Sequence, residues 1–541
     1  MVLSLNGIEN SCAWEEAGIT LPQYNFRKIR ENAKNNPEWV HFGIGNIFRI
    51  FIGSIADRLI ENGDLTSGLV CVESFDFEVV DKIYRPFDDL ELSVILNNDG
   101  TRDKKVLAPF AEALKANPAD QKDWNRLKEV FTFNSLQMVS FTITEKGYSL
   151  KNSSGSYTNL ALRDFENGPD GAKTAMAIVT AMLYERYLHG AYPLALVSMD
   201  NCSHNGERLK EAVLTVAKEW VQRKYCKEEF LSYLSDENQI SFPWTMIDKI
   251  TPRPEEAVAE ELTALGVENM DIVVTDKKTF IAPFGNAEKV QYLVVEDRFP
   301  NGRPPLEKAG VYMTDRETVN KSERMKVCTC LNPIHTALCT YDCMLGYEMF
   351  ADGMRDPDLL KLACLSGYQE GMKVVTDPGI ISPRAFLDEV IHDRMPNPYL
   401  GDTSQRIAVD ISQMVGIRFG ETIKSYVKKY GSAESLVGIP LAIAGWIRYL
   451  LAIDDEGNKF DLAPDPMIPE LQEKISGIEN ADETGIHEKL MPVLSNEHIF
   501  GINLYQAEIG TKIEKMVAEE LQGPHSVRKT LKKYLEDVIT D

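Results

Sequence analysis

The sequence predicts two domains, an N-terminal α/β domain and a mainly helical C-terminal domain. Near the start, the apolar run Trp39–Phe42 leads into Gly43-Ile-Gly45 and a helical pattern, and a second apolar run then ends at Glu73. This order of strand, glycine turn, helix, strand and acid is the one that a dinucleotide-binding βαβ unit requires. We therefore expect a Rossmann-type domain first. From Asn332 onward the pattern is mostly helical.

Length and turn composition place the division between the domains. A chain of 541 residues is too long for one ordinary hydrophobic core. The segment 299–305 holds three prolines and a glycine, which is typical of a crossing between domains. We therefore assign residues 1–300 to the Rossmann-type domain with its N-terminal lead-in, and residues 301–541 to the helical domain, which would carry the substrate and catalytic residues.

Charge and hydropathy exclude two classes of partner. Against 58 Lys and Arg residues stand 82 Asp and Glu, a net charge of −24. Such a field repels nucleic acid and anionic membranes, so we expect neither as a partner. The apolar run Leu436–Ile447 contains Pro440 and is closed by Arg448, which favours a buried helix over a membrane span.

Cysteine usage and the N-terminus favour a cytoplasmic protein without a metal ion. The nine Cys residues are scattered, and an odd number without a secretory signal argues for reduced thiols. The cluster Cys328–Cys343 lacks a second matched pair at zinc spacing, so buried thiols are the better interpretation. Either a monomer or a small homo-oligomer fits these observations.

Apolar runs and helical patterns predict the other elements of the first domain. Helical patterns cover Tyr24–Asn35, Ile50–Ile60 and Ala172–His189. Candidate strands are Ser93–Leu96, Gln137–Thr144, Pro193–Ser198, Asp271–Thr275 and Tyr292–Asp297, the last of which we expect to end the domain.

The glycine turn carries the cofactor prediction. Gly43 permits a tight turn, and Gly45 lets the backbone approach a pyrophosphate at a helix N-terminus. Glu73 is placed to accept hydrogen bonds from the adenosine ribose hydroxyls, and its charge would repel a 2′-phosphate, so NAD is favoured over NADP. Phe48 stands where the usual fingerprint has its third glycine.

Two further stretches hold candidate site residues. Asp200 and Asn201 follow the strand Pro193–Ser198, where they could line a ligand crevice or cap the next helix. Lys326, Asn332 and His335 bring an amine, a carboxamide and an imidazole into ten residues. A buried Lys can act as a base, and Asn can donate to an alkoxide. The alternative is a surface Lys beside a capping Asn and a core His.

Ordered motifs across residues 39–420 resemble the polyol-specific long-chain dehydrogenases, the mannitol dehydrogenase and mannonate oxidoreductase family. Many matches in the same order are far more specific than any one of them. They are Gly43-Ile-Gly45-Asn46-Ile-Phe-Arg49, Ser198-Met-Asp200-Asn201, Asn205-Gly206, Phe242–Pro252, Glu296–Pro300, Gly302–Pro304, Glu323-Arg-Met-Lys326, Leu331–His335, Asn397-Pro398 and Asp402 to Asp410.

The resemblance implies a metal-independent, NAD(P)-linked oxidation of a secondary alcohol on an open-chain sugar derivative. It implies Lys326 as general acid–base, Asn201 and Asn332 as the pair that stabilises the alkoxide, and His335 as the residue that orients the substrate. Asp248 and Arg406 would line the substrate pocket. The residues expected to bind the cofactor are Gly43, Gly45, Asn46, Arg49, Glu73 and Asp200.

Two departures from the family pattern bear on the site. The family usually places four residues between the Lys and the Asn, whereas five, 327–331, intervene here. We keep Lys326 and expect the extra residue to form a bulged first turn. In addition, Met414 stands where the family often has Lys. A cationic substrate contact is then missing, supplied by another group such as Arg418, or not required.

Within the family, the resemblance is greatest to the enzymes that interconvert D-mannonate and D-fructuronate with NADH. Altronate/tagaturonate and mannitol/fructose interconversion are the alternatives. A carboxylate substrate would need a cation, which Arg406 or Arg418 could provide. A protein that binds NAD or a sugar acid without turnover is the alternative outside enzymes.

Overall fold

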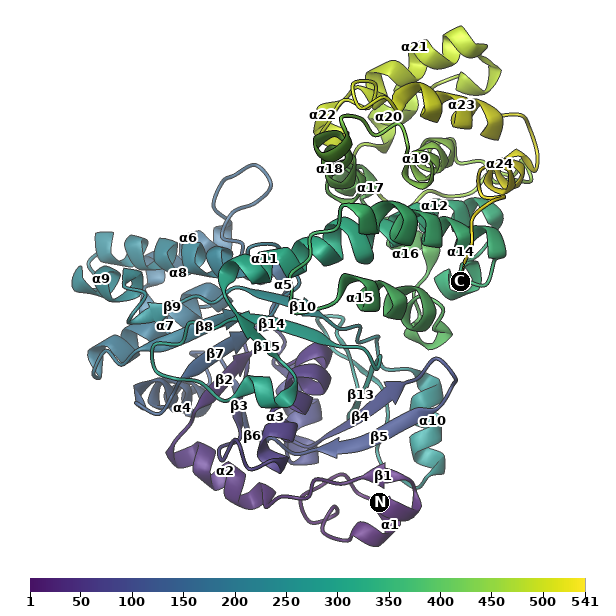
Figure 1. The fold of residues 1–541 in the computed structure, drawn as a ribbon. Coiled ribbons are helices and arrows are strands. Elements are labelled where there is room, and N and C mark those ends of the chain that lie inside the picture. Colours follow the sequence, from purple (N-terminus) through teal and green to yellow (C-terminus); the bar gives the residue numbers. More distant parts are fainter. Residues whose placement is uncertain (541) are drawn as a thin grey trace. The chain divides into compact units, whose positions relative to one another are not determined.

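The computed structural model describes residues 1–540, which fall into two compact units, Met1–Val319 and Asn320–Asp541 (Figure 1). The units divide within helix α11 (Arg316–Met325). Residues 301–319 belong to the first unit because strand β15 (Tyr312–Thr314) pairs in parallel with β14 (Tyr292–Glu296). The strand that we expected to end the first domain, β14, is therefore followed by one more.

A six-stranded parallel sheet forms the centre of the N-terminal unit, in the order β6-β3-β2-β7-β8-β9. This is the doubly wound arrangement of a Rossmann-type domain, so the predicted fold class is confirmed for this part of the chain. The strands are β2 (Trp39–Phe42), β3 (Leu69–Glu73), β6 (Phe110–Lys115), β7 (Met138–Phe141), β8 (Leu194–Ser198) and β9 (Ile240–Ser241).

Helices cover both faces of this sheet, because successive residues of a strand point to opposite sides. Val40 and Phe42 belong to a core with α4 (Gln121–Thr132), α7 (Ala175–Leu188) and α8 (Asn205–Gln222). Trp39 belongs to a second core with the π-helix Phe48–Ile52 and α3 (Gly53–Glu61). The remaining helices of the unit are α1 (Ser11–Glu16), α2 (Phe26–Asn35), α5 (Thr144–Tyr148), α6 (Asn159–Asn167), α9 (Glu229–Ser235) and α10 (Glu256–Ala264).

Smaller sheets complete the N-terminal unit. One has the order β1-β5-β4-β13 and consists of β1 (Ile19–Thr20), β4 (Glu91–Leu96), β5 (Arg102–Leu107) and β13 (Phe284–Ala287). A second joins β10 (Thr245–Asp248) to β14 and β15, and a third pairs β11 (Val273–Val274) with β12 (Phe280–Ile281).

The C-terminal unit is built from helices, as the sequence predicts. They are α12 (Asn332–Leu345), α13 (Phe350–Gly353), α14 (Pro357–Cys364), α15 (Pro383–Glu389), α16 (Ser404–Ile407), α17 (Ile411–Val415), α18 (Glu421–Tyr430), α19 (Gly438–Tyr449), α20 (Ile468–Lys474), α21 (Glu483–Leu494), α22 (Glu497–Phe500), α23 (Gly510–Glu520) and α24 (Ser526–Tyr534).

The apolar run that we interpreted as a buried helix is α19, and every one of its residues is buried. Its N-terminus is capped by a buried acid, since the Glu370 carboxylate accepts hydrogen bonds from the amides of Val437 (2.6 Å), Gly438 (2.7 Å) and Ile439 (2.9 Å). A negative charge at that end also interacts favourably with the positive end of the helix dipole. Within residues 1–540, no helix combines the length and apolar character needed to cross a membrane.

A second buried carboxylate, Glu520 of α23, makes the stability of this unit depend on pH. Its Oε1 accepts the hydroxyl of Tyr341 at 2.7 Å, while Oε2 has no hydrogen-bond partner among residues 1–540. Burial raises the pKa of Glu520 to about 8. In the unfolded chain the pKa of this Glu is the ordinary value of about 4.3. Between about pH 4.3 and pH 8, therefore, the folded state holds a proton that the unfolded state has released.

We therefore expect the free energy of unfolding to fall as pH rises from about 5 to about 8, and Glu520→Gln to remove that dependence. The variant should exceed the wild type at about pH 8.5 by on the order of 1–3 kcal/mol, measured by denaturant unfolding at both ends of the range. Glu473→Gln, at an exposed position, is the matched control. Equal pH slopes for wild type and Glu520→Gln would contradict this assignment.

Candidate active site

The glycine turn lies at the carboxyl edge of the parallel sheet, where the strand order reverses. There β2 is flanked by β3 on one side and β7 on the other. Gly43 has a φ of 88°, and an added Cβ would lie 2.2 Å from the carbonyl oxygen of Thr142. Only glycine fits so close an approach. At Gly45 an added Cβ would meet nothing within 4 Å, so this side of the turn is open.

A buried histidine fixes the turn from inside the sheet. The hydroxyl of Thr142 donates to the carbonyl oxygen of Gly43 at 2.7 Å, so the Nε2–H of His41 donates to Thr142 at 2.8 Å and Nδ1 accepts from Ser140 at 2.6 Å. The ring stacks on Phe48 with centroids 4.0 Å apart. Burial holds the pKa of His41 well below its usual value. We had not placed His41 in the site, although a His inside an apolar strand was the available signal.

Glu73 ends β3, and its carboxylate turns inward. Oε1 accepts hydrogen bonds from the amides of Ser74 (2.9 Å), Phe75 (2.8 Å) and Asp76 (3.2 Å), and Oε2 accepts one from Ile44 at 3.4 Å. The residue is only 6% exposed. Burial raises the pKa of Glu73, and the four amides oppose that rise. Both oxygens thus bind the backbone of the two turns at the carboxyl edge of the sheet, and the contact with ribose hydroxyls stays a prediction.

Arg49 is fully buried beneath the turn. Its Nε donates to Glu91 Oε2 at 2.7 Å, its Nη2 donates to Glu91 and to the carbonyl oxygen of Ala282, and its Nη1 lies 3.4 Å from Asn46 Oδ1. Burial raises the pKa of Glu91 to about 7 despite the opposing charge of Arg49. The guanidinium therefore anchors the helix after the turn to β4 and orients Asn46.

Asp200 is a cap for helix α5. Its carboxylate accepts the amides of Ile143 and Thr144, each at 2.9 Å, and the hydroxyl of Tyr148 at 2.6 Å. Asp200 therefore caps a helix, which was one of the two alternatives. The helix that it caps follows β7, whereas we had expected the one that follows β8. The neighbouring Asn201 is exposed.

Asn205, which we had not placed in the site, ties the loop after β8 to β10. Its amide nitrogen donates to the carbonyl oxygens of Asp200 and Thr245, both at 3.1 Å, and its oxygen accepts the amide of Thr245 at 3.0 Å. Strand β10 then ends at Asp248, which is 7% exposed. Asn205 thereby joins the loop that carries Asp200 and Asn201 to the start of β10, the strand that ends at Asp248.

In the C-terminal unit, Lys326 begins a π-helix, Lys326–Cys330, between α11 and α12. The amide of Leu331 donates to the carbonyl oxygen of Lys326 at 3.0 Å, five residues back instead of the four of an α-helix. The expected bulge is thus present and lies where the sequence has its extra residue. Lys326 itself is 2% exposed.

The π-helix changes which faces the three candidate residues occupy. In a regular α-helix each residue turns by about 100°, so Lys326 and His335 would point to opposite sides. Absorbing one residue brings them to about 80° apart, with Asn332 about 60° beyond His335. Asn332 Oδ1 is buried without a hydrogen-bond partner among residues 1–540, and the ring of His335 contacts Phe350 with centroids 5.0 Å apart.

The two candidate cations of this unit differ in their surroundings. The Arg406 side chain is 67% exposed and forms an ion pair with Asp402. Arg418 is half-buried, and its Nη1 donates at 2.6 Å to the hydroxyl of Thr336, which in turn donates to the carbonyl oxygen of Asn332 at 3.0 Å. Arg418 therefore lies against the first turn of α12, beside Asn332 and His335.

The cysteines near this site are buried thiols. Burial raises the pKa of Cys328 to about 11 and also raises the pKa of Cys330 and of Cys339. Among residues 1–540, no three His, Cys, Asp or Glu side chains gather in a way that could hold a metal ion.

Comparison with known proteins identifies relatives of both units. A model of the mannitol dehydrogenase Rossmann domain matches residues 37–308, and one of the mannitol dehydrogenase C-terminal domain matches residues 318–522. The chain is 48% identical to a D-mannonate oxidoreductase of Thermotoga maritima over 98% of each chain. It is 28% identical to a D-mannonate oxidoreductase of Escherichia coli, over 82% of this chain and 86% of that one.

Solved structures share the fold. A Pseudomonas fluorescens mannitol 2-dehydrogenase, in complex with NAD and D-mannitol, has a TM-score of 0.70 at 23% identity and covers 99% of this chain and 100% of that one. A D-sorbitol dehydrogenase has a TM-score of 0.74 at 24% identity and covers 95% and 100%, respectively. Together with the family models and the 48% identical relative, these likenesses confirm the resemblance that the motifs carry: the chain belongs to the mannitol dehydrogenase family.

Proposed function

We propose that this chain is an NAD-dependent D-mannonate oxidoreductase, which interconverts D-mannonate and D-fructuronate. The observation that carries this proposal is the 48% identity, over 98% of both chains, to a protein named D-mannonate oxidoreductase. The alignment covers both the nucleotide-binding domain and the helical domain, so the likeness extends to both parts of the proposed site. A second relative with the same name, at 28% identity, points the same way.

The residues at the carboxyl edge of the sheet fit a dinucleotide. The forced glycine at position 43 and the open space at Gly45 leave room for a pyrophosphate beside the helix that begins at Asn46. Glu73, Arg49 and Asp200 would support this site indirectly, by holding the surrounding backbone in place. Their charged groups bind backbone amides or a buried partner. When bound here, NAD would supply the acceptor or donor of the hydride.

Lys326 is the proposed general acid–base. Its burial is the environment that favours a neutral amine, which takes the hydroxyl proton in oxidation and returns it in reduction. The amide of Asn332 would donate to the alkoxide oxygen, and its unpartnered carboxamide oxygen is what a residue awaiting a ligand would show. Asn201 keeps the role of second donor, His335 that of orienting the substrate, and Asp248 and Arg406 that of lining the pocket.

Arg418 is the proposed partner of the substrate carboxylate. It is half-buried beside the first turn of α12, and its recorded hydrogen bond uses only one of its five N–H groups. Arg406, in contrast, is exposed and already pairs with Asp402. With Met414 in place of a lysine, Arg418 is the cation best placed to distinguish a sugar acid from a neutral polyol.

The activity itself is tested by the loss of NADH absorbance with D-fructuronate, D-tagaturonate and D-fructose, each with and without EDTA. We expect D-fructuronate to give the highest kcat/KM and EDTA to change nothing, because the proposed base is an amine. Preference for D-tagaturonate or D-fructose would move the substrate assignment to another branch of the family. Loss of turnover in EDTA would contradict the Lys-based mechanism.

Replacing Lys326 tests the acid–base assignment. Lys326→Met, which keeps the length of the side chain, and Lys326→Ala should both lower kcat by about 10²–10⁴. NADH binding, followed by fluorescence titration, should change little, because the proposed cofactor residues belong to the N-terminal unit. Lys373→Ala, at an exposed position of the same unit, serves as control. Substantial turnover in both Lys326 variants would show that another group moves the proton.

Replacing Arg418 tests the substrate class. Arg418→Gln should lower kcat/KM for D-fructuronate by about 10-fold to 100-fold, the usual contribution of a charge-assisted hydrogen bond. The much slower turnover of D-fructose, which has no carboxylate, should change by less than about threefold. Arg355→Gln, at an exposed arginine, controls for the change in charge. Equal losses with both substrates would mean that Arg418 supports the helix instead of the carboxylate.

A further inference from the structure

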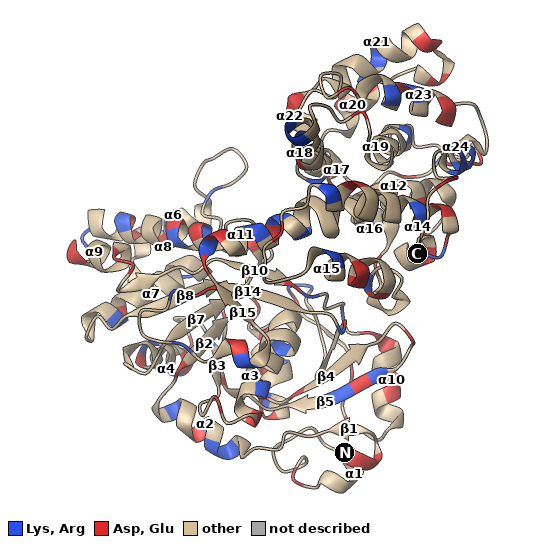
Figure 2. Ribbon diagram, in the orientation of Figure 1, with Lys and Arg blue, Asp and Glu red and all other residues tan. Residues whose placement is uncertain are grey.

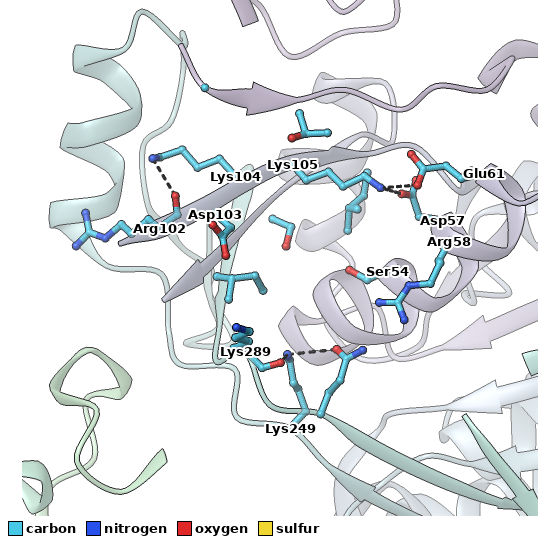
Figure 3. A pocket seen from close by; sticks show the side chains of 16 residues that line it. Ser54, Asp57, Arg58, Glu61, Arg102, Asp103, Lys104, Lys105, Lys249 and Lys289 are labelled. Carbon is cyan, nitrogen blue, oxygen red and sulfur yellow. Dashed lines mark hydrogen bonds and ion pairs between the residues drawn. The ribbon is translucent and has the colours of Figure 1, made fainter. Parts of the chain in front are cut away.

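A cavity of about 520 Å³ lies in the N-terminal unit and has no part in the proposed reaction (Figure 3). It is lined by one face of α3 from Ser54 to Glu61, by residues at β1, β4 and β5, and by residues that follow β10 and precede β14. Ser54, the lining residue of α3 nearest to the glycine turn, lies eight residues after Asn46, which begins the helical segment at that turn. At 1.5 Å per residue, the two are about 12 Å apart along the helix. The cavity is therefore distinct from the cofactor position.

Cationic side chains dominate the lining. Six line the cavity, against three acidic ones, Asp57, Glu61 and Asp103. Lys104 and Lys105 lie on one side, and Lys249 and Lys289 on the other, as Figure 3 shows. Figure 2 shows the same concentration of basic residues on β5. The six are Arg58, Arg102, Lys104, Lys105, Lys249 and Lys289.

Part of this charge is compensated within the protein. Lys105 Nζ lies 2.7 Å from Asp57 and 2.9 Å from Glu61. Arg102 and Lys104 share the carboxylate of Glu261. Two of the three lining acids, Asp57 and Glu61, thus pair with the same lysine. The remaining cations of the lining outnumber the remaining acid, so the other walls of the cavity are positive.

Arg58 and Lys289 are the two exposed cations of the lining, and the charge of Lys289 also acts on the Asp99 carboxylate. Arg58 donates from Nη1 to the carbonyl oxygen of Ala309 at 2.9 Å, which leaves the rest of its guanidinium unused, and neither residue has an ion pair within residues 1–540. Ser54, Ser93 and Thr20 add hydroxyl groups to the lining. In a chain of net charge −24, gathering cations around a cavity has an electrostatic cost that a bound anion would offset.

We propose that this cavity binds a small phosphorylated ligand, a molecule with a doubly charged phosphate group and several hydroxyls. Its volume lies in the range of small-molecule sites, about 300–1,000 Å³. Arg58 and Lys289 would hold the phosphate, by the fork and the point charge that these side chains offer to phosphate oxygens. The Ser and Thr hydroxyls would bind the hydroxyls of the ligand. The site is independent of the proposed reaction.

Calorimetric titration with D-glucose 6-phosphate tests the proposal, in about 150 mM NaCl to screen loose surface binding. Saturating NADH is present, so that the phosphate cannot report on the cofactor position. We expect saturable binding to the wild type, no binding of D-glucose, and binding at least about tenfold weaker in the double variant Arg58→Gln, Lys289→Gln. The control Lys173→Gln, Lys218→Gln makes the same change in net charge at exposed positions outside the cavity and should bind like the wild type.

Three outcomes would overturn the proposal. One is no saturable binding by the wild type, and another is equal affinity in the Arg58 and Lys289 variant, whose folding is checked by its unchanged thermal unfolding midpoint. The third is equal weakening in both double variants, because this would reflect net charge alone. Sodium sulfate that binds as tightly as D-glucose 6-phosphate would likewise show that the ligand hydroxyls have no role.

Discussion

The hydrogen bond from the amide of Leu331 to the carbonyl oxygen of Lys326 determines the geometry of the helical site. It closes a π-turn, and so an extra residue enters the chain without displacing the register of the helix that follows. With a regular α-turn, Lys326 and His335 would face opposite ways. The bulge brings Lys326 and His335 to about 80° apart, with Asn332 about 60° beyond His335, so this local irregularity sets the directions of the three residues that the proposed chemistry uses. π-Bulges are frequent at functional sites for this kind of reason.

Charged groups around the glycine turn act mainly on the protein itself. Glu73 and Asp200 accept backbone amides, and Arg49 is held by Glu91. Each contact satisfies donors that would otherwise be buried without a partner, which costs more than an ordinary hydrogen bond contributes. His41 does the same through Thr142. The turn is thereby rigid before any cofactor arrives, and a site already in shape loses less entropy on binding.

Two buried acids of this chain differ in how many hydrogen bonds their carboxylates accept. In the C-terminal unit, Glu370 has three amide donors at the start of α19, whereas Glu520 has one hydroxyl and an unsatisfied oxygen. Burial opposes ionisation in both, but three amides offset it in the first acid and a single hydroxyl hydrogen bond in the second. In the N-terminal unit the cations that line the cavity are exposed or half-buried, and they outnumber the acids that face them.

Patterns in the sequence are enough to predict the fold class, the positions of β2, β3, β7 and β8, the buried helix α19 and the bulge after Lys326. Each depends on a local pattern, either apolar periodicity, a glycine spacing or a count of residues between motif members. The folded structure was needed to show where Glu73, Arg49 and Asp200 direct their charges and that His41 belongs to the turn. It also revealed the cationic cavity, whose walls come from segments nearly 200 residues apart, from Ser54 to Lys249. A side chain's partners depend on which distant segments the fold brings beside it, and no local pattern encodes that choice.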